Sequence, residues 1–172
     1  ITVNAGVPIA GQRLLLVGAG GAGAGVLGPL IEAGPGSITL TNRSAEKAGP
    51  LLERHAELAA RHGVKLEALP IDDLGSGYDV VINATASSLG GAASPVPAQV
   101  LRPGCLAVDL MYGEPARPFL DWAAAHGAVP RDGLGMLVEQ AAESFSIWRG
   151  VFPPSGQVLD ELRAHLASAV AA

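Results

Sequence analysis

The feature that most constrains the fold is a glycine-rich turn between a short apolar run and a helical stretch. Arg13–Val17 (RLLLV) is predicted to be a strand, and residues 18–23 read GAGGAG, which has the spacing GxGxxG. Between a strand and a helix, the first glycine permits a tight turn, the second lets a pyrophosphate approach the backbone, and the third lets the helix pack closely. An ordinary glycine turn is the alternative, because the chain has 23 glycines. The context predicts a dinucleotide-binding loop, with the pyrophosphate on free N–H groups at the positive end of the helix.

Short β-rich runs alternate with helical stretches along the whole chain. Later strands are predicted at 37–41, 65–68, 78–83, 105–110 and 128–130. Helices are predicted at 22–32, 45–61 (with Ser44 as the N-cap), 119–126, 136–148 and 155–169, and 86–97 is predicted to be mostly loop. This alternation predicts an α/β fold with a doubly wound parallel sheet of about six strands, the Rossmann fold, in the order 3-2-1-4-5-6. Ligands of such sheets bind at the carboxyl ends of the strands.

The composition limits the classes of function. Hydrophobic residues make up 49% of the chain and charged residues 16%, and the net charge of −5 gives no support to a nucleic-acid partner. The single cysteine, Cys105, excludes an intrachain disulfide and a multi-cysteine metal site, and it is expected to be an inert core thiol. No apolar stretch reaches about 18 residues, so no membrane span is expected. With no signal peptide, the default expectation is a cytoplasmic protein without a metal site.

The end of the second predicted strand indicates which dinucleotide is bound. NAD enzymes place an Asp or Glu about 20 residues beyond the glycine motif to hold the ribose 2′-hydroxyl. This chain instead reads TNRS over residues 41–44. Arg43 can bind a 2′-phosphate with two hydrogen bonds, Ser44 can donate another, and Lys47 adds positive charge. Arg43 and Lys47 as solvated surface charges are the alternative, but the missing carboxylate favours NADP over NAD.

Five segments together resemble the C-terminal, NADP-binding part of the shikimate dehydrogenases. In chain order they are GAGGAG (18–23), NRSAEK (42–47), NATASSLG (83–90), DLMY (109–112) and DGLGMLVEQ (132–140). They span nearly the whole chain, and the last is the most specific. Lys47 stands where many members have arginine, which is expected to weaken phosphate binding modestly. The resemblance implies NADPH-dependent reduction of 3-dehydroshikimate to shikimate, a step of aromatic amino-acid biosynthesis.

The resemblance also implies roles for individual residues. The implied cofactor-binding residues are Gly18, Ala19, Gly20, Gly21, Ala22, Asn42, Arg43, Ser44, Lys47, Thr85, Leu110 and Gly133. Leu110 and Gly133 would flank the nicotinamide, and Tyr112 and Gln140 would contact the hydroxyl and carboxylate region of shikimate. Considered without the resemblance, Tyr112 is equally a loop-packing aromatic and Gln140 a helix surface residue. Met136 and Trp148 are expected in the core.

Members of this family carry a catalytic Lys–Asp pair in an N-terminal substrate domain, and this sequence does not contain that domain. Lys47 belongs to the predicted cofactor loop, and Lys65 enters its strand from the amino end, away from the ligand side. None of the four histidines falls on a ligand-side loop, where a general base belongs. Asp109 and Asp132 fall on the correct side, but neither is expected to have a basic partner nearby in sequence, so turn or cap roles are favoured. The sequence therefore predicts no catalytic residue in this chain.

The predicted organisation has two parts. Residues 1–150 form the NADP-binding domain, and 151–172 form a C-terminal helix that packs on the missing substrate domain. The partners expected are shikimate or 3-dehydroshikimate and that N-terminal catalytic domain. A quinate/shikimate dehydrogenase that uses NAD and a non-catalytic dinucleotide-binding module remain as alternatives.

Overall fold

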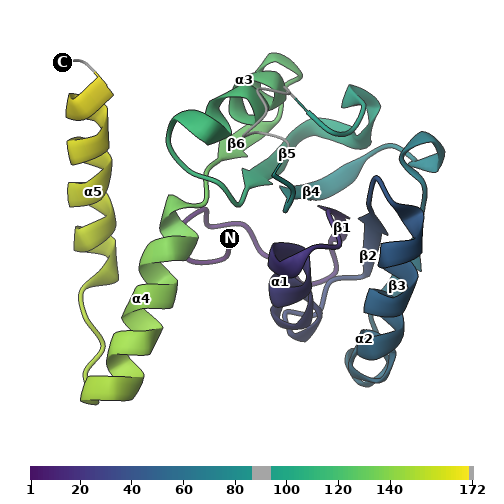
Figure 1. Ribbon diagram of the computed structural model, residues 1–172, viewed down its shortest axis with the longest axis horizontal. Coiled ribbons are helices and arrows are strands. Elements are labelled where there is room, and N and C mark those ends of the chain that lie inside the picture. The colour runs from purple at the N-terminus through teal and green to yellow at the C-terminus, as the bar shows by residue number, and fades with distance from the viewer. Residues whose placement is uncertain (87–93, 171–172) are drawn as a thin grey trace.

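The computed structural model describes residues 1–86 and 94–170, which form a parallel β-sheet flanked by helices (Figure 1). The strands are β1 Arg13–Val17, β2 Ser37–Thr41, β3 Lys65–Ala68, β4 Tyr78–Asn83, β5 Leu101–Asp109 and β6 Val129–Arg131. Each strand pairs in parallel with its neighbour, in the order β3-β2-β1-β4-β5-β6. The predicted doubly wound fold and its strand order are confirmed. The order reverses between β1 and β4, which is where such sheets bind ligands.

Helices cover both faces of the sheet. They are α1 Gly21–Glu32, α2 Ala48–His62, α3 Arg117–Ala125, α4 Leu134–Arg149 and α5 Ser155–Val170. Short 3₁₀ turns lie at Ala45–Lys47, Ile71–Asp73, Ala98–Val100 and Glu114–Ala116. The last two helices, α4 and α5, lie side by side at the edge of the molecule far from β3 (Figure 1), and they pack through Leu134, Val138 and Leu159.

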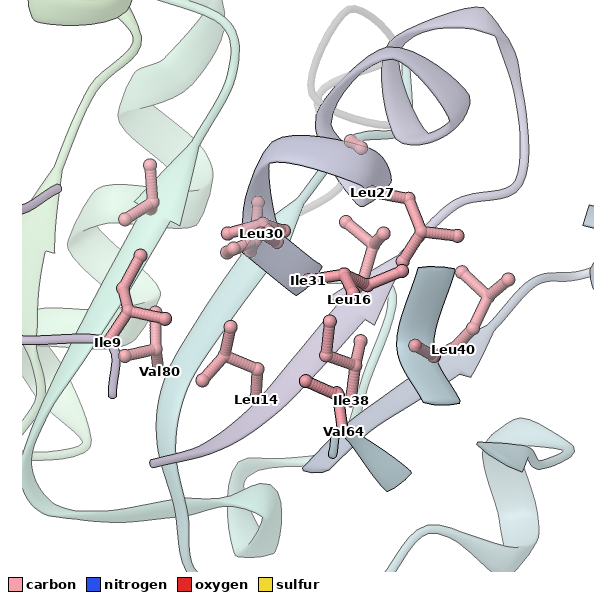
Figure 2. Packing of buried hydrophobic residues seen from close by; sticks show 14 of the residues in the cluster. Ile9, Leu14, Leu16, Leu27, Leu30, Ile31, Ile38, Leu40, Val64 and Val80 are labelled. Atoms are coloured by element: carbon pink, nitrogen blue, oxygen red, sulfur yellow. The ribbon is translucent and has the colours of Figure 1, made fainter. Parts of the chain in front are cut away.

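The sheet divides the interior into two aliphatic cores. Successive side chains of a strand point to opposite faces, so Leu14 and Leu16 join the core under α1 and α2, while Leu15 and Val17 join the core under α3. Figure 2 shows the first core, in which α1 side chains meet those of β1 and β2. Cys105 lies in the second core, and its burial raises the pKa of the thiol, which keeps it protonated and unreactive.

Several helix ends and β6 differ from the sequence predictions by one or two residues, and the starts of α2 and β5 differ by more. Ser44 is not a helix N-cap: a 3₁₀ turn follows it, α2 begins at Ala48, and the Ser44 carbonyl instead accepts from the side chain of Asn42. The strand β5 begins at Leu101, four residues early, because the exposed residues 102–104 and a register shift hide its start from the apolar pattern. Leu110 lies just beyond this strand rather than within it. Of the predicted 86–97 loop, 87–93 lie outside the described residues.

Trp148 is not a core residue: 78% of its surface is exposed. It lies at the C-terminal end of α4, where Phe145 and Ile147 are exposed as well. Met136, near the start of the same helix, is partly buried and lines a groove described below. Within 1–86 and 94–170, no helix combines the length and apolarity needed to cross a bilayer.

Candidate functional site: a dinucleotide-binding edge

The loops at the carboxyl edge of the sheet are joined to one another by backbone hydrogen bonds. The donors and acceptors are Gly18 N and Thr41 O (2.8 Å), Ala84 N and Val17 O (2.8 Å), Leu110 N and Asn83 O (3.0 Å), and Gly133 N and Met111 O (2.8 Å). The first three bonds connect the end of one strand to the loop after a neighbouring strand, and the fourth connects the loops after β5 and β6. The edge on which the sequence places the ligand is therefore a single connected rim.

The three motif glycines have different reasons to lack a side chain. Gly18 has φ of +111°, and a Cβ there would lie 2.9 Å from the carbonyl oxygen of Ala84. A Cβ at Gly23 would overlap the carbonyl oxygen of Gly18. Gly20 has an ordinary extended conformation, and a Cβ there would meet no atom within 4 Å. The fold itself requires Gly18 and Gly23, whereas the open space at Gly20 is what an approaching ligand needs.

The N-terminus of α1 opens onto this space. The helix begins at Gly21 with Gly20 as its N-cap, and no side chain in the described part of the chain caps it. The first four N–H groups of a helix have no partner within the helix, and the helix dipole makes this end positive. No acidic side chain lies in the first turn to oppose an anion. This end of α1 therefore fits a phosphate group.

Asn42 joins the glycine loop to the loop after β2. Its Oδ1 accepts from the backbone N–H of Ala19 (3.1 Å), and its Nδ2 donates to the carbonyl of Ser44 (2.9 Å). The resemblance assigns Asn42 to cofactor binding. In the structure, the two ends of its amide hold the glycine loop and the loop after β2 together. Arg43 and Lys47 are exposed beside it, and neither forms an ion pair within 1–86 and 94–170.

A buried polar pair lies under the loops after β4 and β5. Asn83 and Asp109 are register partners with no exposed surface, and Asn83 Nδ2 donates to Asp109 Oδ2 (3.0 Å). Asn83 Oδ1 accepts from both N and Oγ1 of Thr85 (3.1 and 2.7 Å). Asp109 Oδ1 accepts from the backbone N–H of Met111 (2.8 Å). The turn role expected for Asp109 is correct, but its pairing with Asn83 was missed, although both are polar residues that end apolar strands.

A groove of about 1210 Å³ begins at this edge and runs between α1 and the α4–α5 pair. It brings together four of the predicted site residues: Ala22, Leu110, Gly133 and Gln140. Gly133 is held tightly, because a Cβ there would overlap the carbonyl oxygen of Leu110. Tyr112 is 42% exposed and is not among the described residues that line the groove.

An ion pair closes one side of the groove. Asp132 Oδ1 lies 3.1 Å from Arg163 Nη2, so the turn before α4 is tied to α5. The adjacent Arg131 donates to the carbonyl of Pro130 instead, and the partner of Asp132 comes from 31 positions further along the chain. Within the described residues, no group of three or more His, Cys, Asp or Glu side chains is arranged to hold a metal ion.

The parallel sheet and the glycine loop at its switch point define a Rossmann domain of the dinucleotide-binding class. Comparison with known families agrees with this class. The model of the family "Shikimate / quinate 5-dehydrogenase" matches residues 3–91, and that of the "Shikimate 5'-dehydrogenase C-terminal domain" matches residues 133–163. The chain belongs to the shikimate/quinate dehydrogenase family, which confirms the resemblance seen in its motifs.

Comparison with individual proteins agrees with this family assignment. A shikimate dehydrogenase (NADP⁺) from Methylibium petroleiphilum is 66% identical over 169 residues, which cover 98% of this chain and 58% of that protein. The structure of a Thermus thermophilus shikimate 5-dehydrogenase with NADP(H) and shikimate has a TM-score of 0.72 at 31% identity, covering 95% of this chain and 58% of the other. A 5-ketofructose reductase from a Gluconobacter species has a TM-score of 0.74 at 30% identity, covering 94% and 60%. The chain thus spans about three fifths of the length of each.

Proposed function

We propose that this chain is the NADP-binding domain of a shikimate dehydrogenase, which reduces 3-dehydroshikimate to shikimate with NADPH. The observation that carries the proposal is the open backbone of Gly20 at the uncapped start of α1, with Arg43 exposed on the neighbouring loop. The relatives support it, because they include a shikimate dehydrogenase (NADP⁺) and a shikimate 5-dehydrogenase in complex with NADP(H) and shikimate.

The proposed cofactor site follows the carboxyl edge. The N–H groups of Gly18–Ala22 would hold the pyrophosphate, because they lie at the positive end of α1. Arg43, Ser44 and Lys47 would bind the 2′-phosphate, with Asn42 fixing the position of their loop through its bond to Ser44. Thr85, Leu110 and Gly133 would lie along the nicotinamide half, on the loops that the Asn83–Asp109 pair supports. When bound, NADPH supplies the hydride.

We also propose that Tyr112 and Gln140 contact the substrate, while the proton donor comes from the rest of the protein. Hydride addition to a ketone leaves an alkoxide, which needs a proton at its oxygen. No lysine or histidine is present among the described residues that line the groove. The relatives are longer than this chain. We place the proton donor in the part of the protein that corresponds to their remaining residues.

The proposed division of the chain falls at residue 150, where α4 ends at a left-handed glycine. Five of the exposed apolar side chains lie close to this point in the sequence: Phe145, Ile147, Trp148, Val151 and Phe152. A monomer rarely exposes such a group of side chains without a partner. We assign the substrate domain of the complete protein as that partner, packed on α4 and on the helix within 151–172.

Cofactor preference tests the proposal directly. NADPH is expected to bind at least about tenfold more tightly than NADH, because a charge-assisted contact of Arg43 with the 2′-phosphate contributes roughly 1.5–3 kcal/mol. The variant Arg43→Ala should remove most of this difference. Arg61→Ala, which removes an exposed arginine at the far end of α2, should preserve it. Titration calorimetry at low salt measures both affinities, and equal affinities in the unmodified chain would refute the proposed cofactor.

A further inference from the structure

We propose that Asn83 and Asp109 are positioning residues that hold the loops after β4, β5 and β6 in one arrangement for the nicotinamide half of the cofactor. This inference rests on the proposed function. It concerns two side chains with no exposed surface, which lie below the rim and are among the few buried polar residues of the described chain.

The first step is the direction of the Asn83 amide. An ionised carboxylate only accepts hydrogen bonds, whereas an amide has a donor end and an acceptor end. Asp109 therefore requires the NH₂ group of Asn83 to face it, at 3.0 Å, which turns the carbonyl oxygen of Asn83 toward Thr85. Both N–H and O–H of Thr85 donate to this oxygen. Asp109 thus orients, through Asn83, the oxygen that accepts from Thr85.

The second step is the loop after β5. The other oxygen of Asp109 accepts from Met111 N at 2.8 Å, and Leu110 N donates to the carbonyl of Asn83. Met111 O then accepts from Gly133 N at 2.8 Å. The two side chains, together with these backbone bonds, link Thr85, Leu110 and Gly133, the three residues proposed to lie along the nicotinamide half. The adenosine loop at Arg43 is held separately, through Asn42.

This separation gives the proposal a selective test. In Asp109→Asn, the new amide offers a donor as well as an acceptor, so position 109 no longer selects which end of the Asn83 amide faces it. The Asn83 oxygen that accepts from Thr85 is then no longer fixed in place. We expect the affinity for NADP⁺ to fall about tenfold. The affinity for 2′,5′-ADP, which lacks the nicotinamide half, should change by less than about twofold because its contacts lie elsewhere. Titration calorimetry with both ligands measures the ratio.

A matched control separates positioning from general loosening. Thr39→Val breaks another side-chain bond of the same sheet, from buried Thr39 Oγ1 in the middle of β2 to Oε1 of partly exposed Glu67 (2.8 Å). It should leave the ratio of the two affinities unchanged. In Asp109→Asn, an equal loss of affinity for NADP⁺ and for 2′,5′-ADP would contradict the proposal. Unchanged affinity for both ligands would contradict it too. Failure of the unmodified chain to bind NADP⁺ would instead refute the proposed function.

Hydrogen exchange in the unmodified chain tests whether the Asn83–Asp109 pair holds the loops, even if Asp109→Asn does not fold. In the unmodified chain, the amides of Thr85 and Met111 should exchange at least about 100-fold more slowly than unprotected loop amides, because each donates to a buried side chain. Exposed Gly113, in the same loop as Met111, serves as the internal reference. Exchange of Thr85 and Met111 at the rate of Gly113 would show that the pair does not hold these loops.

Discussion

The variant Gly20→Val is expected to lose NADPH binding while the empty protein remains folded. A Cβ at this position would meet no atom within 4 Å, and the backbone conformation is an extended one, so the fold is expected to accept a side chain here. The same side chain would occupy the place proposed for the pyrophosphate. We expect the affinity to fall by at least about 100-fold, equivalent to about 2.8 kcal/mol. Titration calorimetry measures the loss.

Thermal unfolding of the empty protein provides the control for this variant. Gly20→Val should shift the midpoint by no more than about 4 °C, since valine is a poorer N-cap than glycine by an amount of order 1 kcal/mol. Gly23→Ala should lower the midpoint far more, because its Cβ would overlap the backbone of Gly18. Normal NADPH binding by Gly20→Val would show that the motif is only a turn.

The second large effect concerns turnover. The 172-residue chain is expected to bind NADPH yet show no measurable oxidation of shikimate with NADP⁺ at any pH. General acid–base catalysis accelerates a reaction by a factor of roughly 10²–10⁴. Orientation of the substrate beside the cofactor contributes a larger factor. The groove offers Gln140 on one wall, with Tyr112 nearby on its loop, but no lysine or histidine among its described lining. A steady-state assay of the chain measures the rate.

A chimera tests where the missing groups come from. The remaining part of the Methylibium petroleiphilum relative, joined ahead of Ile1, should yield an active enzyme, because that protein is 66% identical over the shared part. In this chimera, Tyr112→Phe and Gln140→Ala should each impair activity. Turnover by the isolated chain close to that of the chimera would mean that the catalytic residues lie within the 172 residues.

The local parts of the site were predictable from the sequence. The strand, glycine turn and helix at residues 13–32 are contiguous, so their pattern and spacing were sufficient to place the phosphate loop. The requirement for glycine at Gly18 and Gly23 also followed from the motif, and the structure shows the close backbone contacts behind it. The strand order followed from the alternation of strands and helices, because right-handed crossovers permit few arrangements.

The parts that depend on distant contacts were not predictable. Asn83 and Asp109 are 26 residues apart, and they meet only because β4 and β5 pair in one particular register. The partner of Asp132 comes from α5, which packs back on α4. The helical period places Trp148 on an apolar face, but it does not tell whether another element covers that face. Each of these outcomes is decided by tertiary packing rather than by local pattern.

Amide chemical shifts during an NADP⁺ titration test the central claim most directly, because one spectrum reports both binding and location. In the nitrogen-labelled chain, the largest saturable shifts should fall on the glycine loop at Gly20 and Gly21 and on Arg43 and Ser44. Amides at the opposite edge of the sheet, such as Gly63 after α2, should remain unchanged. Shifts that cluster away from the carboxyl edge, or no saturable shifts at millimolar NADP⁺, would contradict the assignment of this chain as an NADP-binding domain.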